Sequence, residues 1–327
     1  MKSKILVAFA VVALVACSQE NVVDTPQAAI TFSNAFIENS THVTKVVDPS
    51  VTKTSLEGFA VWGYRDNTSN VVFEGEIVTP VAGTDKWTYS STQYWIPYSK
   101  YYFAALAPIN STNWNLNTTG ANTYGPGTVS FTNVDGTEDL LYSAAAVETP
   151  NLNTLLASGM PAVELTFSHL LSKLKFTFTN GLNEDYISLV VKDITMDVPA
   201  AATINLAVEN WWDNDDWNLS GTNNTVLNFG AAEKIAQGAS ASSANQRLTI
   251  PAAASQEYEV TFVVEVWMND ELVMEIPKTA ILSGKAFQMG KSYNIKSTLT
   301  VENLGLKPIV FDVERVEGWI EGEDATL

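Results

Sequence analysis

Residues 258–268 constrain the fold of this chain more than any other stretch. Apolar side chains occupy every second position, and mostly polar or charged side chains lie between them. A period of two residues is typical of a β-strand with one buried face and does not suit an α-helix. An Asn-Asp turn follows, and residues 272–276 return as the partner strand. The sequence therefore predicts a β-hairpin whose side chains Phe262 and Val264 lie in a core.

Short stretches of the same kind follow one another along the chain, and no segment keeps a helical period over three turns. Residues 151–159 can hold one helical turn, whereas residues 110–127, 210–218 and 233–246 are predicted as loops or irregular segments. The sequence therefore predicts an all-β chain built from β-sandwiches. The predicted strands are residues 29–37, 59–64, 71–78, 87–89, 94–97, 101–106, 129–131, 140–145, 163–167, 174–178, 187–191, 194–198, 258–268, 272–276, 291–299 and 309–316.

The N-terminus has the layout of a secretory signal peptide. Lys2 and Lys4 precede an unbroken apolar run over residues 5–16, which is too short to cross a bilayer core of roughly 30 Å as a helix. The run ends in Leu-Val-Ala-Cys, which resembles a bacterial lipobox, so Cys17 is the predicted lipidation site and first mature residue. The alternative is an ordinary cleaved signal with an incidental cysteine. Because Cys17 is the single cysteine, no intrachain disulfide or cysteine metal cluster can form.

The charge balance argues against two classes of partner. The chain has 18 basic and 36 acidic residues, and cleavage would remove Lys2 and Lys4. An acidic protein repels phosphate backbones, which argues against a nucleic-acid partner. The same charge argues against docking on anionic lipid through basic patches, so membrane attachment would depend on acyl chains.

Composition and turn spacing together indicate two domains. Residues 1–16 are the predicted signal peptide, and residues 17–28 are the predicted lipidated tether. Residues 29–160 are expected to form an N-terminal β-sandwich domain. Residues 161–327 are expected to form a C-terminal β-sandwich domain with a terminal strand.

No catalytic, metal or cofactor site is predicted. The two histidines are His42, in a polar stretch, and His169, at a strand start. Nothing in the spacing fixes a triad around His169, for which a structural hydrogen bond is the expected role. Residues 120–127 are rich in glycine but do not form a phosphate-binding loop.

A loop with three tryptophans is the most distinctive local cluster. Trp211, Trp212 and Trp217 stand beside acids and amides. Three readings stay open for this loop: the rings stack on a sugar, the acidic and amide oxygens bind calcium, or the tryptophans pack on a sandwich edge.

Several short motifs are spread in order along the mature chain. They read FAVWGY at 59–64, YWIP at 94–97, YYFAA at 101–105, LTFSHLLSKL at 165–174, GKSYNI at 290–295 and VEGW at 316–319. In this order and spacing they resemble the fimbrillin family, the type V pilins and Mfa-like lipoproteins of Bacteroides-type bacteria.

The resemblance implies two tandem transthyretin-like β-sandwich domains and a role as a structural, adhesive or accessory subunit of surface fimbriae. In that family a lipidated precursor reaches the outer membrane, and a trypsin-like protease removes the first strand. A strand from the C-terminal end of another subunit then fills the vacated groove, which is a form of β-augmentation. The implied partners are other fimbrial subunits, the outer membrane through a lipid anchor, and a host or bacterial surface ligand.

The family pattern places its functional residues as follows. Lys45 is the candidate cleavage site, and Lys53 is the fallback. Family members are commonly cut after an arginine. Because this chain has lysine at both positions, it is a poor substrate for an arginine-specific protease. An uncut protein would fit an anchor or capping role. The alternative function is a monomeric surface lipoprotein that binds glycans. The displaced first strand presents Ile30, Phe32 and Phe36, and the candidate donor strand presents Ile309, Phe311, Val313, Val316, Trp319 and Ile320.

Overall fold

A computed structural model describes residues 28–37, 56–84, 86–211, 217–219, 221, 223–305 and 307–316, with the backbone alone for residues 34–37. Among the described residues, no helix is long and apolar enough to cross a membrane. The predictions for the signal peptide, Cys17, Lys45, Lys53, Trp212, Trp319 and Ile320 lie outside the described residues.

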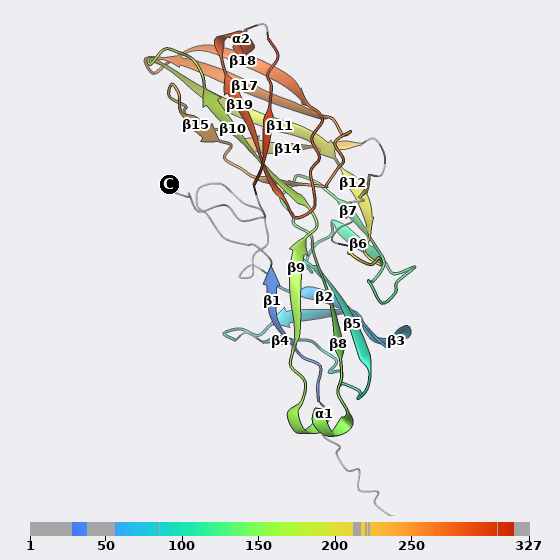
Figure 1. The fold of residues 1–327 in the computed structure, drawn as a ribbon. Helices are drawn as coiled ribbons and strands as arrows, with labels where there is room; N and C mark the ends of the chain where they lie inside the picture. Colours follow the sequence, from blue (N-terminus) through green and yellow to red (C-terminus); the bar gives the residue numbers. More distant parts are fainter. Residues whose placement is uncertain are drawn as a thin grey trace, which may run out of the picture.

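The lower part of the molecule in Figure 1 is built on a seven-stranded sheet. Apolar residues alternate along many of its strands, because successive side chains of a strand point to opposite faces of the sheet. An isolated bridge between Ser33 and Lys86 brings the two edges of this sheet together, because Ser33 lies in one edge strand and Lys86 directly precedes the other. The sheet therefore curls back on itself. In spatial order the strands are β1 (Phe32–Ile37), β9 (Val163–His169), β8 (Leu141–Glu148), β5 (Lys100–Ala107), β2 (Phe59–Arg65), β3 (Asn67–Pro80) and β4 (Trp87–Thr88).

The inner face of this curled sheet encloses an aromatic core, which we call the lower core. Its members come from alternate positions of the strands and from the segment that follows β4. They include Ile30, Phe32, Phe59, Phe73, Trp95, Tyr101, Phe103, Leu141, Val163, Leu165 and Phe167.

A small four-stranded sheet joins the two halves of the chain. Its strands are β13 (Asn218–Leu219), β12 (Ala201–Asn205), β7 (Thr128–Thr132) and β6 (Trp114–Asn117). β12 pairs with β7 over five residue pairs, from Ala201 and Thr132 to Asn205 and Thr128. This sheet and the outer face of the curled sheet cover a second cluster, here called the junction core, which includes Trp62, Leu106, Phe131, Tyr142, Leu170, Leu171, Ile204, Leu206, Trp211, Trp217 and Leu248.

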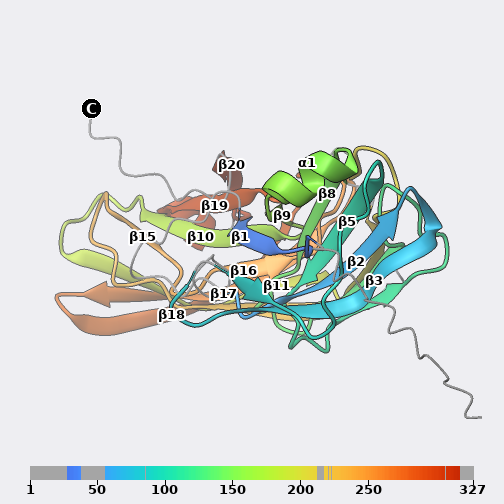
Figure 2. The ribbon, with the colours of Figure 1, turned by 90° about the horizontal axis from the view of Figure 1, so that it is seen from below.

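The upper part is a sandwich of two sheets, here called the upper sandwich (Figures 1 and 2). One sheet has the order β15 (Ser240–Ser242), β10 (Ser172–Asn180), β19 (Ser292–Leu299) and β20 (Asp312–Val316), and β16 (Arg247–Thr249) also pairs with β10. The other sheet has the order β14 (Asn224–Gly230), β11 (Ile187–Pro199), β17 (Tyr258–Met268) and β18 (Glu271–Leu282). Their inner faces meet in an apolar core around Phe176, Phe178, Phe229, Phe262 and Phe311.

Two short helices complete the described structure. α1 (Leu152–Ser158) begins at Asn151, whose side chain accepts a hydrogen bond from the Thr154 backbone N–H, and ends at Gly159 with φ of 67°. α2 (Val301–Leu304) begins in a capping box between Thr300 and Asn303. α1 lies at the lower end of the molecule in Figure 1, and α2 lies at the upper end.

The all-β prediction is confirmed, and so is the hairpin: β17 covers residues 258–268 and pairs with β18. Several expectations differ. β1 starts at Phe32 rather than at residue 29, residues 94–97 form no strand beyond an isolated bridge at Tyr94, and the predicted strands 187–191 and 194–198 are one strand, β11. β6 lies inside the predicted loop 110–127, β15 lies inside the irregular segment 233–246, and β20 starts at Asp312 rather than at residue 309. These strands are short, and β6 and β15 are rich in polar residues, so their local patterns are weak.

The strand pairing bears on the proposed division of the chain. β9 lies beyond residue 160, yet it pairs with β1 and β8 in the curled sheet. The next strand, β10, belongs to the upper sandwich. A boundary between β9 and β10, near residue 170, therefore fits the sheets better than one at residue 160.

Candidate functional site

The first strand fills a slot between two neighbours. On one side β1 runs parallel to β9, with Phe32 opposite Val163, and the Val163 N–H donates to the Thr31 carbonyl at 2.7 Å. On the other side the Ile30 N–H donates to the Gln93 carbonyl at 2.8 Å. Two flanking segments therefore hold residues 28–37, as the sequence analysis expected of a strand in this region.

Phe32 is the side chain that anchors this segment. It is buried, and its ring centroid lies 5.8 Å from Phe59, 5.7 Å from Phe73 and 6.0 Å from Phe103. The Phe59, Tyr89 and Phe103 rings meet it edge-on, an arrangement that aromatic rings prefer over face-to-face stacking. Removal of β1 would therefore leave an apolar pocket lined by aromatic rings.

Tyr89 adds a polar clamp on the same segment. Its hydroxyl donates to the Ile30 carbonyl at 2.7 Å and accepts from the Gln93 N–H at 3.1 Å. Burial raises the pKa of the Tyr89 phenol, so the hydroxyl keeps the proton that it donates. Ile30 itself is buried in the lower core.

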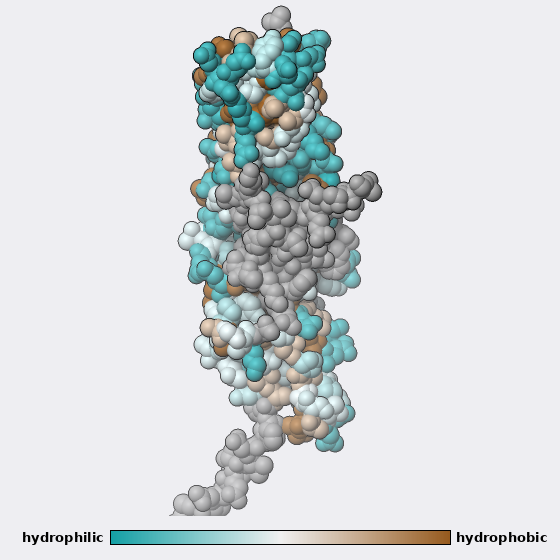
Figure 3. All heavy atoms as spheres, turned by 90° about the vertical axis from the view of Figure 1, so that its left-hand side faces the viewer, coloured by the Kyte–Doolittle hydropathy of each residue, from teal (hydrophilic) through white to brown (hydrophobic). Residues whose placement is uncertain are grey.

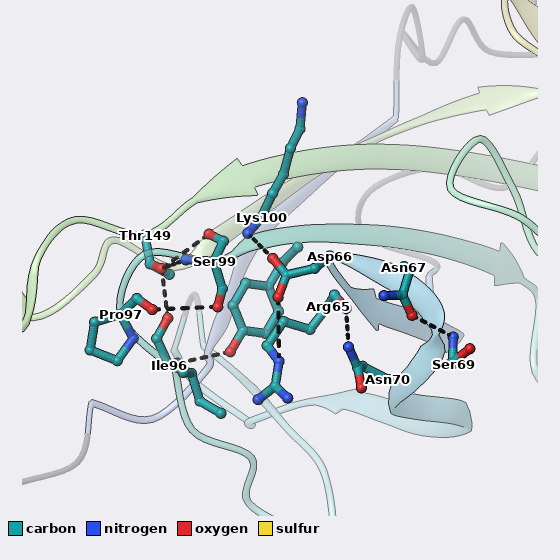
Figure 4. A network of polar contacts seen from close by, with 11 residues as sticks. Arg65, Asp66, Asn67, Ser69, Asn70, Ile96, Pro97, Ser99, Lys100 and Thr149 are labelled. Carbon is teal, nitrogen blue, oxygen red and sulfur yellow. Dashed lines mark hydrogen bonds and ion pairs between the residues drawn. The ribbon is translucent and has the colours of Figure 1, made fainter.

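A polar network secures the loop that follows (Figure 4). The Thr149 hydroxyl accepts from the Ser99 N–H at 2.9 Å and donates to the Ile96 carbonyl at 2.6 Å. The Lys100 N–H donates to the Asp66 carboxylate at 2.8 Å. Since the Trp95 N–H donates to the Ala28 carbonyl at 2.9 Å, the network fixes one wall of the slot that holds residues 28–37.

The candidate donor strand lies elsewhere, at the edge of an upper sheet. β20 pairs antiparallel with β19, from Asp312 opposite Lys296 to Val316 opposite Ser292. Ile309 and Phe311 are buried, and the Phe311 ring lies 5.8 Å from that of Phe176. Val313 and Val316 are half-buried. These residues therefore serve the core of their own domain in this structure.

The described tryptophans of the predicted glycan loop do not form an open platform. Trp211 and Trp217 are each 7% exposed and belong to the junction core. The Trp211 ring meets Tyr142 edge-on at 4.6 Å. Neither ring offers a free face to a sugar. Both rings pack against the protein, which was the third alternative for this loop.

His169 has a structural position. Its Nδ1 lies 2.8 Å from a carboxylate oxygen of Asp139, and both side chains are buried beside the junction core. No group of three or more potential metal ligands among His, Cys, Asp and Glu occurs in the described part of the chain. The expected role of His169 in a buried hydrogen bond is confirmed.

Sequence reasoning missed the partners of the first strand. It did not identify β9, Tyr89 or the Gln93 backbone as the groups that hold residues 28–37. The alternation of Val163, Leu165 and Phe167 was visible, but pairing between distant segments leaves no local signal. The aromatic positions were visible as candidate core residues only.

The chain matches the sequence model of a family described as fimbrillin-like over residues 44–319. Among solved structures it is similar to a fimbrial protein from Bacteroides vulgatus ATCC 8482, with 16% identity, a TM-score of 0.57, and coverage of 88% of this chain and 99% of that one. It is also similar to the fimbrial anchor protein Mfa2 from Porphyromonas gingivalis, with 12% identity, a TM-score of 0.37, and coverage of 90% and 98%.

No curated protein matches the chain in sequence. The family match extends over most of the chain and includes every motif on which the resemblance was based. The likeness to the Bacteroides vulgatus protein independently supports the same fold. The chain therefore belongs to the fimbrillin-like family.

Proposed function

We propose that this protein is a structural subunit of cell-surface fimbriae and that β1 is the segment replaced by a strand of another subunit. The observation that carries the proposal is Phe32, a terminal-strand side chain that fills an aromatic pocket in the lower core. Family membership and the fold shared with a fimbrial protein support the fimbrial role. They favour a structural protein over an enzyme.

Loss of β1 would create a strong acceptor. The β9 edge and the Gln93 region would lose their backbone partners, and the rings of Phe59, Phe73 and Phe103 would lose their cover. An unpaired edge beside an apolar groove readily takes up another strand. Backbone bonds supply general affinity, and alternate side chains entering the pocket supply the register.

The proposed donor is the C-terminal region. β20 is an edge strand, and Ile309, Phe311 and Val313 alternate along its approach. Ile309 and Phe311 already pack in the upper sandwich, and re-exposing such a side chain costs roughly 1.5–3 kcal/mol. Donation from β20 must therefore recover that burial in the acceptor. Residues 317–327, with Trp319 and Ile320, are the other part of the proposed donor.

Maturation is the step that would release β1. We place the cut at Lys45 or, failing that, Lys53, both of which lie between β1 and β2 in the sequence. A trypsin-like enzyme accepts lysine through a buried acid, while a site built for the planar guanidinium does not. Attachment to the outer membrane before assembly is proposed to occur through lipid on Cys17.

The test is limited trypsin treatment of the purified full chain, followed by gel electrophoresis without boiling. We expect a ladder of multimers that resists mild denaturation. Deletion of residues 316–327 should abolish the ladder. Lys45→Gln combined with Lys53→Gln should prevent both cleavage and laddering.

A matched variant separates strand exchange from aggregation of damaged protein. Phe32→Ala weakens the hold on β1 without changing the donor, so a ladder should form at lower trypsin exposure than for the unmodified chain. Trypsin-cut protein that remains monomeric, together with an N-terminus at Cys17 in protein from cells, would show that this subunit is no stalk pilin.

A further inference from the structure

A cleft of about 430 Å³ is lined by three segments, which meet at the end of the molecule opposite α1 (Figure 1). It is formed by residues 185–188 at the start of β11, the segment after β14, and the turn between β17 and β18. Figure 3 shows that end as mostly hydrophilic, with apolar residues interspersed. The lining residues are Asp185, Tyr186, Ser188, Lys234, Ala236, Asn269 and Asp270.

Backbone bonds fix the three walls relative to one another. Asn269 and Asp270 both have positive φ, at 49° and 66°, as a tight hairpin turn requires. The Asn269 N–H donates to the Tyr186 carbonyl at 3.1 Å, which ties this turn to the neighbouring wall. Leu189 and Ile235 exchange two backbone hydrogen bonds of 2.9 and 2.7 Å, which ties the third wall to β11.

Charged groups hold one side of the cleft in place. Lys234 Nζ lies 2.6 Å from a carboxylate oxygen of Asp270 and 4.7 Å from the centroid of the Trp267 ring. The Trp267 indole N–H donates to Glu265 at 2.9 Å, and Glu265 also pairs with Lys192. The positions of Lys234 and Asp270 are therefore set by a network that continues onto the outer face of the sheet.

Other side chains in the cleft have no partner among the described residues. Within the described residues, the side chains of Asp185, Ser188 and Asn269 make no hydrogen bond or ion pair, although all three line the same cleft. Tyr186 is 44% exposed. The cleft thus combines a free aromatic ring with an unpaired carboxylate, amide and hydroxyl.

We propose that this cleft binds a carbohydrate, with a sugar ring stacked on Tyr186 and its hydroxyls bonded by Asp185, Ser188 and Asn269. A sugar has an apolar C–H face for the ring and hydroxyls that donate to carboxylates and accept from amides. The volume lies in the range of about 300–1,000 Å³ that is usual for small-ligand sites. This site is distinct from the tryptophan loop of the junction core, and the proposal does not depend on strand exchange.

Other ligand classes fit less well. Asp185 and Asp270 disfavour an anion, and the whole chain carries a formal net charge of −18. The cleft holds two carboxylates, and no group of three potential ligands among His, Cys, Asp and Glu occurs in the described residues to bind a metal ion. Its lining is about half polar, which suits a ligand that carries hydroxyls better than a pure hydrocarbon.

The test uses the purified full chain on a printed panel of neutral and sialylated oligosaccharides, followed by titration calorimetry with the strongest binder. We expect a neutral oligosaccharide to bind, and both Tyr186→Ala and Asp185→Asn to weaken it at least tenfold. Tyr98→Ala is the matched control, because Tyr98 is 79% exposed near the opposite end, and it should bind like the unmodified chain. Thermal melting confirms that each variant folds.

Three results would overturn the proposal. They are the absence of binding by every oligosaccharide at about 1 mM, binding that Tyr186→Ala leaves unchanged, and binding that a chelator abolishes, which indicates a metal-dependent site instead. Trypsin-induced ladders provide the independent readout for assembly. Tyr186→Ala should still form them, so failure of the glycan site and failure of the fimbrial role are distinguishable.

Discussion

Phe262 lies in the middle of the upper sandwich, with its ring centroid 5.1 Å from that of Phe178 and 6.3 Å from that of Phe311. It is 2% exposed, as the alternation of residues 258–268 predicts. Phe262→Ala should lower the free energy of unfolding by about 3–5 kcal/mol, because the rings around it cannot close the cavity. Urea denaturation measures this change.

The control for that substitution is Val226→Ala, on β14 of the same sheet at a position that is 56% exposed. Its effect should stay within about 0.5 kcal/mol. A loss below about 1 kcal/mol for Phe262→Ala would mean that the ring contributes little to the core despite its burial.

Tyr142 makes stability depend on alkaline pH. Burial raises the pKa of its phenol, whereas an exposed tyrosine ionises near pH 10. Above about pH 10 the unfolded chain loses this proton while the folded chain retains it, so the free energy of unfolding falls as the pH rises. Tyr142→Phe should make that fall less steep between about pH 8 and pH 11 in urea denaturation.

The same substitution should cost nothing at neutral pH. The Tyr142 hydroxyl has no hydrogen-bond partner among the described residues, and removing an unsatisfied buried hydroxyl is neutral or stabilising. The phenylalanine ring keeps the contact with Trp211. Tyr98→Phe, at an exposed position, should leave the pH profile as it is, and equal profiles for both variants would refute this role of Tyr142.

Cys17 tests the attachment of the protein to the membrane. Cys17→Ala should release the protein from the outer membrane fraction or block its maturation, because the predicted lipidation site is lost. Mass spectrometry of the mature N-terminus should find more than one acyl chain, since a single chain anchors only marginally. Unchanged membrane association without any acyl mass would contradict the lipobox interpretation.

Among the elements, the hairpin of β6 and β7 depends on a glycine. Gly127 has φ of 128°, and a Cβ there would lie 2.1 Å from the Asn117 carbonyl oxygen. Gly120 also has positive φ, at 87°, but has nothing within 4 Å. Both Gly→Ala variants pay a backbone cost of order 1–3 kcal/mol. Gly127→Ala should lose about 1–3 kcal/mol more, because the carbonyl must move.

Thermal melting of the two variants checks this difference. Equal losses would show that the Asn117 carbonyl yields without cost. A larger loss for Gly127→Ala would confirm that the approach of the two strands, and not the backbone conformation alone, requires glycine at this position.

The elements also show where sequence reasoning succeeds. β17 has one buried face along most of its length, so apolar residues alternate with mostly polar ones in its sequence. This pattern predicts the bounds of the strand to the residue. β6 carries Trp114 and Leu116 toward the junction core, but it has four residues and lies among asparagines and glycines. A strand that short has too few positions to show a period.

The candidate sites were predicted only in part, for a related reason. Ile30 and Phe32 were identified because their own strand alternates, whereas their partners come from distant segments. The cleft around Tyr186 draws on three segments and has no motif of its own. The tryptophan loop was misleading because its composition is polar, while Trp211 and Trp217 turn inward.

At the scale of the whole molecule, the junction core joins the two halves of the chain. β12 completes the sheet of β7, and the Asn133 side chain donates to the Leu248 carbonyl at 3.1 Å. We therefore expect a single unfolding transition in urea, with tryptophan fluorescence and circular dichroism coinciding. Separate transitions for the two probes would contradict this coupling.

Truncation tests the same coupling in a different way. A chain that ends at residue 170 lacks Ile204, Leu206 and Trp211, which cover the apolar faces of Phe131 and Tyr142. Such a fragment should aggregate or bind a hydrophobic dye, because an uncovered apolar patch favours association. A soluble, monomeric fragment with a cooperative melt would show that the lower half folds alone.

The route by which the chain enters β1 determines how the protein responds to a pulling force. Residues 28–31 approach β1 from the end that carries α1, and β1 then runs parallel to β9 toward the middle of the molecule (Figure 1). A force applied at residue 28 along the long axis therefore acts along the strand, so its backbone bonds are sheared together instead of being unzipped in turn. A replacement strand in the same slot would bear tension in the same way, and a joint between subunits would give way only when the whole set of bonds breaks at once.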